Sequence, residues 1–293
     1  MFHFTYLQAI VVGLLQGVTE LFPISSLGHA VLVPAWLGGS WKSFAADPQY
    51  LLIAVAFHLA SAIALFIIFG RRWLNILGSA LRGLRKDPSA GSGLPLLLRL
   101  IVGTLPVALL GLALNKFFEK NFGKPLYAAC FLTINGLILF GVERLTDRRH
   151  AHAMAKDSNT AIVERVSLGQ ALVVGVGQST ALFAGISRFG VSISFGMMRG
   201  LSRSVAADFA FLLAFPAILG ASLFKLPQLM HHGAIAAGSN GALLAGTIAA
   251  FIATFISVKF LVKYFRSNTL RRFALYCLLV GVISILRFGV FGS

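Results

Sequence analysis

The chain has 293 residues, of which 57% are hydrophobic and only 12% are charged. A water-soluble domain cannot bury so large an apolar fraction, so this composition excludes an ordinary soluble fold and indicates a membrane protein. The formal net charge of +16 is compatible with a nucleic-acid partner, but most basic residues lie in short segments between apolar stretches, where membrane topology explains them. We therefore expect the bilayer, and no nucleic acid, as a partner.

Apolar segments predict the helices. A bilayer core about 30 Å thick needs roughly 20 apolar residues per helix. Two apolar regions, 5–37 and 167–200, are interrupted near their middles by Pro or Gly and by polar groups, which is typical of re-entrant helical hairpins whose bends face protein or a cavity. The predicted fold class is an all-α polytopic membrane protein. Six further segments fit single spans, in chain order 51–69, 96–114, 126–142, 207–224, 242–262 and 273–291.

The two interrupted regions match each other in sequence. At an offset of 162 residues, 8–29 falls on 170–191 with nine identities in 22 positions, including two Gln pairs and a Ser pair. Shared apolar composition does not easily match Gln and Ser in register, so we predict an internal repeat within one integral membrane domain. Its halves are 1–150 and 151–293, each with one re-entrant hairpin and three spans. An odd number of spans gives the repeat an inverted topology.

Basic residues predict how this repeat is oriented. The connecting segments 70–95, 143–166 and 263–272 hold most of the Arg and Lys residues, so the positive-inside rule makes them cytoplasmic. We expect 78–95 to be a flexible cytoplasmic connector. The first hairpin then enters from the outside and the second from the inside. Their polar bends meet near the midplane, where such folds place their site.

The first bend lies in ELFPISSLGHA (20–30). Gln16 and Glu20 are four residues apart and share one helix face. Pro23 ends that helix, because the residue before a proline is pushed out of the helical region. A charged carboxylate inside a membrane helix is unfavourable by about 2.5–3.5 kcal/mol, which favours a functional role for Glu20 over a simple bridge between helices.

Hydroxyls, an imidazole and a guanidinium complete the two bends. Ser25 and Ser26 stand where serine caps a new helix, whose free N–H groups and positive dipole end attract anions. His29 lies on the first turn of that helix. The second bend, AGISRFG (184–190), adds Arg188, whose guanidinium can hold two phosphate oxygens. These groups predict a phosphate-sized site within the membrane, in which Ser26 is either a cap or a nucleophile.

The motifs resemble those of a known family, the undecaprenyl-diphosphate phosphatases, also called bacitracin-resistance proteins. Segment 16–29, QGVTELFPISSLGH, is similar to the family's (E/Q)xxxE pair and TEFLPxSSxGH signature, and 184–192, AGISRFGVS, is similar to its PGxSRSGxT signature. Segment 202–221 resembles a further family segment, SR…FSFLL…P…GA. Three positions of the second signature depart from the pattern: Ala184 replaces a proline, Phe189 replaces a serine beside the arginine, and Ser192 replaces a threonine but keeps a hydroxyl.

The resemblance implies hydrolysis of undecaprenyl diphosphate to undecaprenyl phosphate and inorganic phosphate. The reaction takes place at the outer (periplasmic) face of the bacterial cytoplasmic (inner) membrane. It recycles the carrier lipid for peptidoglycan and cell-wall synthesis and confers bacitracin resistance. A divalent cation, Mg²⁺ or Ca²⁺, is the implied cofactor, and a polyprenyl diphosphate lipid is the implied partner. The sequence leaves a homodimer open.

Several roles remain open for the residues that match the family. Arg188 holds a phosphate, and Ser26 attacks or positions water. His29 is a base, an acid or a phosphate ligand, and Glu20 with Gln16 carries the cation or activates the attacking group. The predicted catalytic set is Glu20, Ser26, His29 and Arg188, the predicted metal ligands are Gln16 and Glu20, and the predicted substrate-binding set is Ser25, Gly28, Gly185, Ser187, Gly190 and Ser192.

Other polar residues have plainer explanations. His58 and Asn135 lie within spans and either line the site or form interhelical hydrogen bonds, of which the second is the commoner case. His231 and His232 have the pattern of an exposed loop pair. The strongest alternative function is a transporter or flippase for a lipid phosphate or small organic anion, because inverted repeats with broken hairpins are a transporter architecture.

Overall fold

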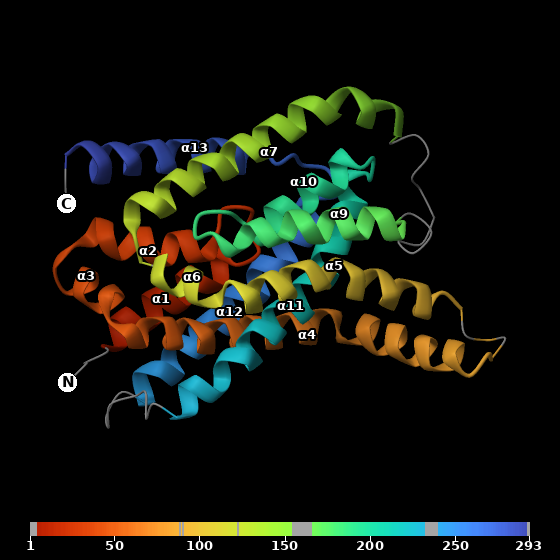
Figure 1. Cartoon of the computed structure of the whole chain (residues 1–293), viewed down its shortest axis with the longest axis horizontal. Coiled ribbons are helices and arrows are strands. Elements are labelled where there is room, and N and C mark those ends of the chain that lie inside the picture. The colour runs from red at the N-terminus through yellow and green to blue at the C-terminus, as the bar shows by residue number, and fades with distance from the viewer. Residues whose placement is uncertain are drawn as a thin grey trace.

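The computed structural model describes residues 5–87, 89, 91–121, 123–153, 166–231 and 240–291. Within this part of the chain, every regular element is helical. The six predicted spans are confirmed as helices, and the chain is an all-helical polytopic membrane protein (Figure 1). The stretches apolar and long enough to cross a membrane are Ile53–Leu84, Gly93–Ala113, Pro125–Thr146, Arg203–Pro227, Asn240–Tyr264 and Arg271–Val290.

Long helices form the bundle, and shorter ones join them or interrupt it. The long helices are α4 (Pro48–Leu84), α5 (Gly93–Ala113), α7 (Pro125–Ala153), α11 (Arg203–His231), α12 (Asn240–Tyr264) and α13 (Arg271–Ile285), the last continued by a π-helical turn, η3 (Leu286–Val290). The short ones are α1 (Tyr6–Thr19), α2 (Ser26–Leu37), α3 (Gly39–Ala46), α6 (Asn115–Asn121), α9 (Leu168–Ser179), η2 (Thr180–Leu182) and α10 (Arg188–Met198).

The predicted ends of α4, α7 and α11 are each wrong by more than a turn, and the error is largest for α4. α4 continues to Leu84, because buried apolar side chains recur at helical spacing as far as Ala80. The loop predicted over 70–95, with its flexible connector at 78–95, is therefore largely helix. Only the residues between Leu84 and Gly93 join α4 to α5.

Other differences concern the ends of elements. α7 runs to Ala153, inside the predicted 143–166 connection, and 154–165 lies outside the described residues. Of the predicted exposed pair, His231 is the last residue of α11 and its side chain lies outside the described part of the chain, as does the whole of His232. The short helices α3 and α6 were not predicted, because neither is long or apolar enough to read as a span.

Both hairpin regions fold as two short helices joined by a bend. The Thr5 hydroxyl accepts from the Gln8 N–H, while the Gln8 side chain accepts from the Thr5 N–H at the start of α1. Ser167 and Gln170 form the same capping box at the start of α9. The two boxes lie at the offset of 162 residues that aligns the sequences. The matched sequences therefore form the same local structure twice.

Close glycine contacts attach each hairpin to a long helix. Gly13 of α1 packs on Gly246 of α12, so closely that a Cβ at Gly13 would overlap the backbone of α12. Gly175 of α9 packs on Gly103 of α5 in the same way. Small residues at such contacts let membrane helices approach closely. Both bends consequently lie side by side inside the bundle (Figure 1).

Candidate functional site

The two bends are hydrogen-bonded to each other. Ser25 precedes α2 with a φ of 71°, a left-handed conformation that is unfavourable for a residue with a side chain. Its Oγ accepts from the Gly28 N–H at 3.2 Å and from the Gly185 N–H of the other bend at 3.1 Å. Ser187 donates its hydroxyl to the Phe22 carbonyl oxygen at 3.2 Å. These contacts fix one bend against the other.

Asn135 of α7 binds both bends from one side. Its Nδ2 donates to the Pro23 carbonyl oxygen at 3.0 Å, and its Oδ1 accepts from the Ser187 N–H at 3.0 Å. The side chain is fully buried. Its Nδ2 also donates to Cys277 Sγ of α13 at 3.3 Å, which confirms the predicted interhelical hydrogen bonding for Asn135. Because α1 already ends at Thr19, Pro23 lies within the bend and not at the helix end.

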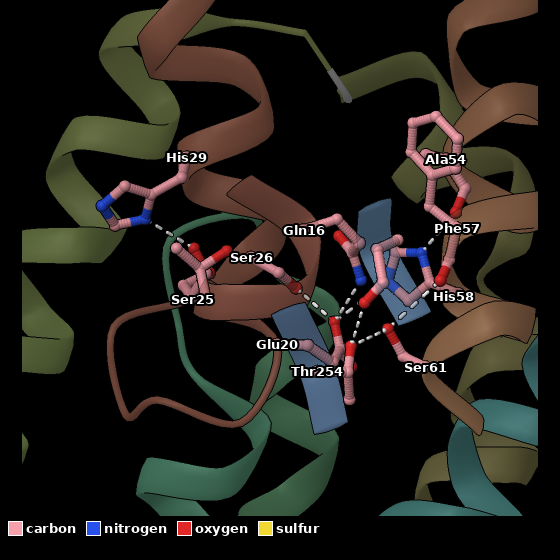
Figure 2. A network of polar contacts seen from close by, with 12 residues as sticks. Gln16, Glu20, Ser25, Ser26, His29, Ala54, Phe57, His58, Ser61 and Thr254 are labelled. Atoms are coloured by element: carbon pink, nitrogen blue, oxygen red, sulfur yellow. Dashed lines mark hydrogen bonds and ion pairs between the residues drawn. The ribbon is translucent and has the colours of Figure 1, made fainter. Parts of the chain in front are cut away.

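The carboxylate of Glu20 faces three donors with one oxygen (Figure 2). Oε2 accepts from Gln16 Nε2 at 2.7 Å and from Ser26 Oγ at 2.5 Å, and it lies 3.3 Å from His58 Nε2. Within the described residues, no hydrogen bond reaches the other oxygen, Oε1. The predicted closeness of Gln16 to Glu20 is confirmed. We call these four residues the Glu20 cluster.

The hydroxyls of the two adjacent serines make different hydrogen bonds. Ser25 caps α2, since its Oγ accepts from the Gly28 N–H. Ser26, the first residue of α2, turns its hydroxyl away from the backbone and donates to Glu20. A hydroxyl hydrogen-bonded to a buried carboxylate has the arrangement of a nucleophile beside its base. The geometry thus separates the cap from the candidate nucleophile, which the sequence did not.

His58 comes to the cluster from α4. Its Nδ1 donates to the Ala54 carbonyl oxygen at 2.7 Å, so Nε2 is the ring atom that faces Glu20, and it donates to the carboxylate as the second N–H of a protonated, positively charged imidazole. One turn further along α4, Ser61 Oγ bonds Thr254 Oγ1 of α12 at 2.9 Å. No motif in the sequence marks His58, and only the packing of α4 against the first bend reveals its place in the site.

His29 faces away from the Glu20 cluster (Figure 2). Its Nδ1 lies 2.8 Å from the Ser25 carbonyl oxygen, its Nε2 lies 2.8 Å from the Tyr276 hydroxyl, and the two rings stack. Because a carbonyl oxygen only accepts, Nδ1 carries the proton and Nε2 accepts from Tyr276. The structure therefore brings Glu20 and Ser26 together and leaves His29 apart, with both ring nitrogens occupied.

Arg188 begins α10 directly after the second bend. Its Nη1 is buried and has no hydrogen-bond partner among the described residues. Its charge acts on both Glu20 and His58. A buried guanidinium nitrogen without an acceptor is suited to bind an anion, and here it lies at the bend that meets the Glu20 hairpin. The site thus combines a hydroxyl–carboxylate pair with a cationic donor that has no protein acceptor.

The remaining predicted substrate-binding residues support the second bend. Gly190 donates its N–H to Ser187 Oγ at 3.2 Å. Gly185 has a φ of 115°, a conformation that favours glycine. Ser192 is buried on α10, one turn after Arg188. Their contact with a substrate stays a prediction.

The Glu20 cluster does not form a metal cage. In the described part of the chain, no group of three or more His, Cys, Asp or Glu side chains is placed to hold an ion together. Glu20 offers one carboxylate, whose Oε2 already faces three donors, and Gln16 presents its amide N–H to that oxygen. Mg²⁺ and Ca²⁺ take oxygen ligands, several at a time. Gln16 and Glu20 by themselves therefore do not fit a resident cation.

Aromatic side chains cover one side of the two bends. Phe189 is buried and packs on Phe211 and Phe265, with ring centroids 4.5 and 5.6 Å apart. Phe22 of the first bend stacks on Phe260 of α12 at 5.9 Å. We call these five residues the aromatic cluster. Phe189, which stands where the family pattern has serine, therefore packs among other rings.

A second buried carboxylate lies next to the aromatic cluster. Glu143 of α7 accepts from Arg203 of α11 at both oxygens, 2.9 Å from Nε and 2.7 Å from Nη2. The Leu270 N–H, just before α13, donates to the same carboxylate at 2.7 Å. The charges of Glu143 and Arg203 also act on Tyr264, which packs on Phe265. Three long helices are thus joined at one point, which the sequence did not reveal.

Comparisons with known proteins cover nearly the whole chain. Residues 9–283 match the model of the family described as bacitracin resistance protein BacA. The chain is 41% identical to an undecaprenyl-diphosphatase of Mycolicibacterium paratuberculosis, with 97% of each chain covered. It is 38% identical to undecaprenyl-diphosphatase 2 of Frankia alni, with 99% of this chain and 100% of the relative covered. An undecaprenyl-diphosphatase of Acidiphilium cryptum is 41% identical, with 96% and 98% covered.

Proposed function

The chain belongs to the family of bacitracin resistance proteins, and on that premise we propose that it hydrolyses undecaprenyl diphosphate to undecaprenyl phosphate and inorganic phosphate. This reaction recycles the carrier lipid for cell-wall synthesis and confers resistance to bacitracin. One observation supports this site for the reaction: among the described residues the Nη1 of Arg188 has no acceptor, and Arg188 belongs to the same site as the hydrogen-bonded pair of Ser26 and Glu20.

Ser26 is the proposed nucleophile. Its hydroxyl lies 2.5 Å from Glu20 Oε2, so the carboxylate is placed to take the proton as Oγ attacks the terminal phosphorus. The bond from that phosphorus to the bridging oxygen breaks, and undecaprenyl phosphate leaves. Water then attacks the phosphoserine, Ser26 Oγ leaves with the proton held by Glu20, and inorganic phosphate is released. If Ser26 positions a water instead, the same oxygen of Glu20 accepts the proton.

Arg188 is the proposed phosphate ligand. A phosphoryl group in transfer carries negative charge on its outer oxygens, and fixed cationic donors lower the barrier most where they meet that charge. The free Nη1 supplies such a donor without first breaking a protein contact. His29 does not contact Ser26 or Glu20, so the proposal gives it no proton transfer with this pair.

The divalent cation is proposed to arrive with the substrate, bound to its diphosphate oxygens. The absence of a cage among the described side chains supports this over a resident ion. Mg²⁺ commonly keeps several waters and is bound through substrate phosphates. We then expect the protein to bind the diphosphate in its cation-bound form. Removal of the cation by EDTA should therefore abolish activity.

The halves 1–150 and 151–293 are proposed to form an inverted repeat whose site opens to the outer face. In Figure 1 the hairpin of α1 and α2 reaches the middle of the bundle from the end where α3 lies, and α9 and α10 reach it from the opposite end. The aromatic cluster and the Glu143–Arg203 pair support closure of the end that the basic segments make cytoplasmic.

The comparisons lend no support to the alternative of a transporter or flippase. Alternating access would have to open both the aromatic cluster and the buried Glu143–Arg203 pair, which is bonded at both oxygens. A homodimer stays a prediction, and the mass of the purified protein in nanodiscs would decide it.

The direct test is phosphate release from undecaprenyl diphosphate by the purified protein in detergent, with Mg²⁺, Ca²⁺ or EDTA. Glu20→Gln, Ser26→Ala and Arg188→Ala should each lower release about 100-fold or more. Ser284→Ala is the matched control, because Ser284 is a buried serine whose hydroxyl accepts from the Trp36 indole N–H and has no part in the proposed reaction. If Ser26→Ala releases phosphate at the wild-type rate, the attacking group is water and not Ser26. No release by folded wild-type protein would overturn the proposal.

A further inference from the structure

We infer that His58 is a positioning residue for the proposed reaction: it ties the Glu20 carboxylate to α4 and thereby keeps Oε2 turned toward Ser26. The inference rests on the proposed function. No signature in the sequence includes His58, and the geometry alone assigns it this role.

The contacts of Glu20 differ in what they attach it to. Gln16 lies one turn earlier on α1, and Ser26 follows six residues later at the start of α2, so both belong to the same hairpin as the carboxylate. His58 lies on α4, a separate long helix. Among the described residues it is the one direct side-chain contact between the Glu20 carboxylate and a long helix. Without it, the carboxylate is oriented only by groups that move with its own hairpin.

The imidazole is itself held in place. Nδ1 donates to the Ala54 carbonyl oxygen at 2.7 Å, which fixes the plane of the ring and leaves Nε2 pointing at Glu20 (Figure 2). α4 is joined to α12 one turn further by the contact of Ser61 with Thr254, at 2.9 Å. His58 therefore has the rigid support that a group which positions another group needs.

The position of His58 matters because all three donors meet the same oxygen. Oε2 is the atom that faces the Ser26 hydroxyl, so it is the atom that must receive the proton. A second and a third donor on Oε2 oppose rotation of the carboxylate, which would otherwise present Oε1 to Ser26. Misplacement of a reacting group by about 1 Å can lower a rate 100-fold. Loss of His58 should therefore lower kcat, while KM changes little because His58 acts through Glu20 and the proposal gives it no contact with the lipid.

Three substitutions separate positioning from simple packing. Gln places its amide nitrogen near the place of Nε2, so His58→Gln can restore the contact with Glu20. Asn places its amide nitrogen near the place of Nδ1, so His58→Asn keeps only the contact with Ala54. His58→Leu keeps the bulk and removes both contacts. A packing role predicts that Gln and Asn behave alike, and a positioning role predicts that only Gln restores activity.

The experiment is steady-state kinetics of phosphate release by these variants, with melting temperatures measured in the same detergent. We expect kcat to fall about 10-fold or more in His58→Leu and His58→Asn, to stay within about threefold in His58→Gln, and KM to stay within about twofold throughout. In a Glu20→Gln background, His58→Leu should have no further effect on kcat. Wild-type kcat in His58→Leu, or equal loss in Gln and Asn, would overturn the inference.

A double-mutant cycle of melting temperatures tests this inference independently of the proposed function. Glu20→Gln, His58→Leu and the double variant are melted without substrate, and the loss in the double variant should be smaller than the sum of the single losses because the residues are in contact. If the wild-type protein releases no phosphate, the proposed function fails and the cycle still decides the contact. Additive losses would overturn the tie between His58 and Glu20 whether or not the enzyme is active.

Discussion

Two carboxylates are buried among the membrane helices of this protein, and they are satisfied in different ways. Glu143 has both oxygens bonded by the Arg203 guanidinium and a third donor in the Leu270 N–H. Among the described residues, Glu20 has three donors on one oxygen and none on the other, and no Arg or Lys bonds it directly. The arrangement at Glu143 therefore leaves neither carboxylate oxygen without a donor for a ligand to bind.

The difference separates a structural ion pair from a candidate site. A buried pair is stable only if the geometry is good and the remaining lone pairs are bonded, and Glu143 with Arg203 meets both conditions. At the Glu20 cluster the positive charge, Arg188, keeps a nitrogen without an acceptor. A site prepared for an anionic substrate is expected to look incomplete in this way when the substrate is absent.

The largest expected effect comes from Glu20→Gln. The amide keeps the shape of the side chain and still accepts from Ser26, but it cannot take the proton, so kcat should fall by about 10²–10⁴. The melting temperature should change by only a few degrees. Phosphate release per folded molecule is the measurement. The same exchange at Glu143 is the control, and equal loss of activity from both would erase the distinction between the two carboxylates.

Glu143→Ala should act on stability and not on chemistry. It leaves the buried Arg203 without its partner, which costs about 3–5 kcal/mol of folding free energy. Unfolding by denaturing detergent gives the value. In Glu143→Leu with Arg203→Leu the unpaired charge is gone, so most of the loss should be recovered. Failure of the double variant to recover would mean that the bond to Leu270 carries the stability instead.

Phe189→Ser restores the family residue and tests whether a change outside the Glu20 cluster affects stability more than chemistry. The phenyl ring is buried against Phe211 and Phe265. Its removal should lower the free energy of unfolding by about 3 kcal/mol, because a cavity is left in the aromatic cluster. kcat for the folded fraction should stay within about threefold. A rise of 10-fold or more in kcat would show that the missing hydroxyl limits the wild-type enzyme.

Much of the fold could be predicted from the sequence, because the bilayer imposes a length and a composition on each span. The six long helices and the two interrupted regions follow from that constraint. The end of α4 could not be predicted in this way. An amphipathic helix can continue past the membrane with charges on its exposed face, so its hydropathy falls. In α4 the buried side chains nevertheless continue to Ala80. Boundaries therefore depend on packing partners that the local sequence does not specify.

The site was predictable only where its residues are close in sequence. Gln16, Glu20 and Ser26 lie within one bend, so their spacing predicts contact. His58 and Tyr276 arrive from distant helices as single residues without a motif, and nothing in their neighbourhoods separates them from other polar residues in spans. Long-range contacts of this kind are set by how the helices pack, which the spacing of residues in one segment cannot give.

The smallest expected effect concerns His29, whose ring nitrogens are both bonded, as the oxygens of Glu143 are. Tyr276→Phe removes the hydroxyl from Nε2 and keeps the stacked ring. One hydrogen bond is worth about 1 kcal/mol, so kcat/KM should change by no more than about fivefold. Phosphate-release kinetics measure it, with Tyr50→Phe, which loses a buried hydroxyl bonded to the Ala30 carbonyl oxygen, as the matched control. If kcat/KM falls 100-fold in Tyr276→Phe and not in Tyr50→Phe, His29 and Tyr276 take part in the reaction. They are then not a structural contact of the kind that Glu143 makes.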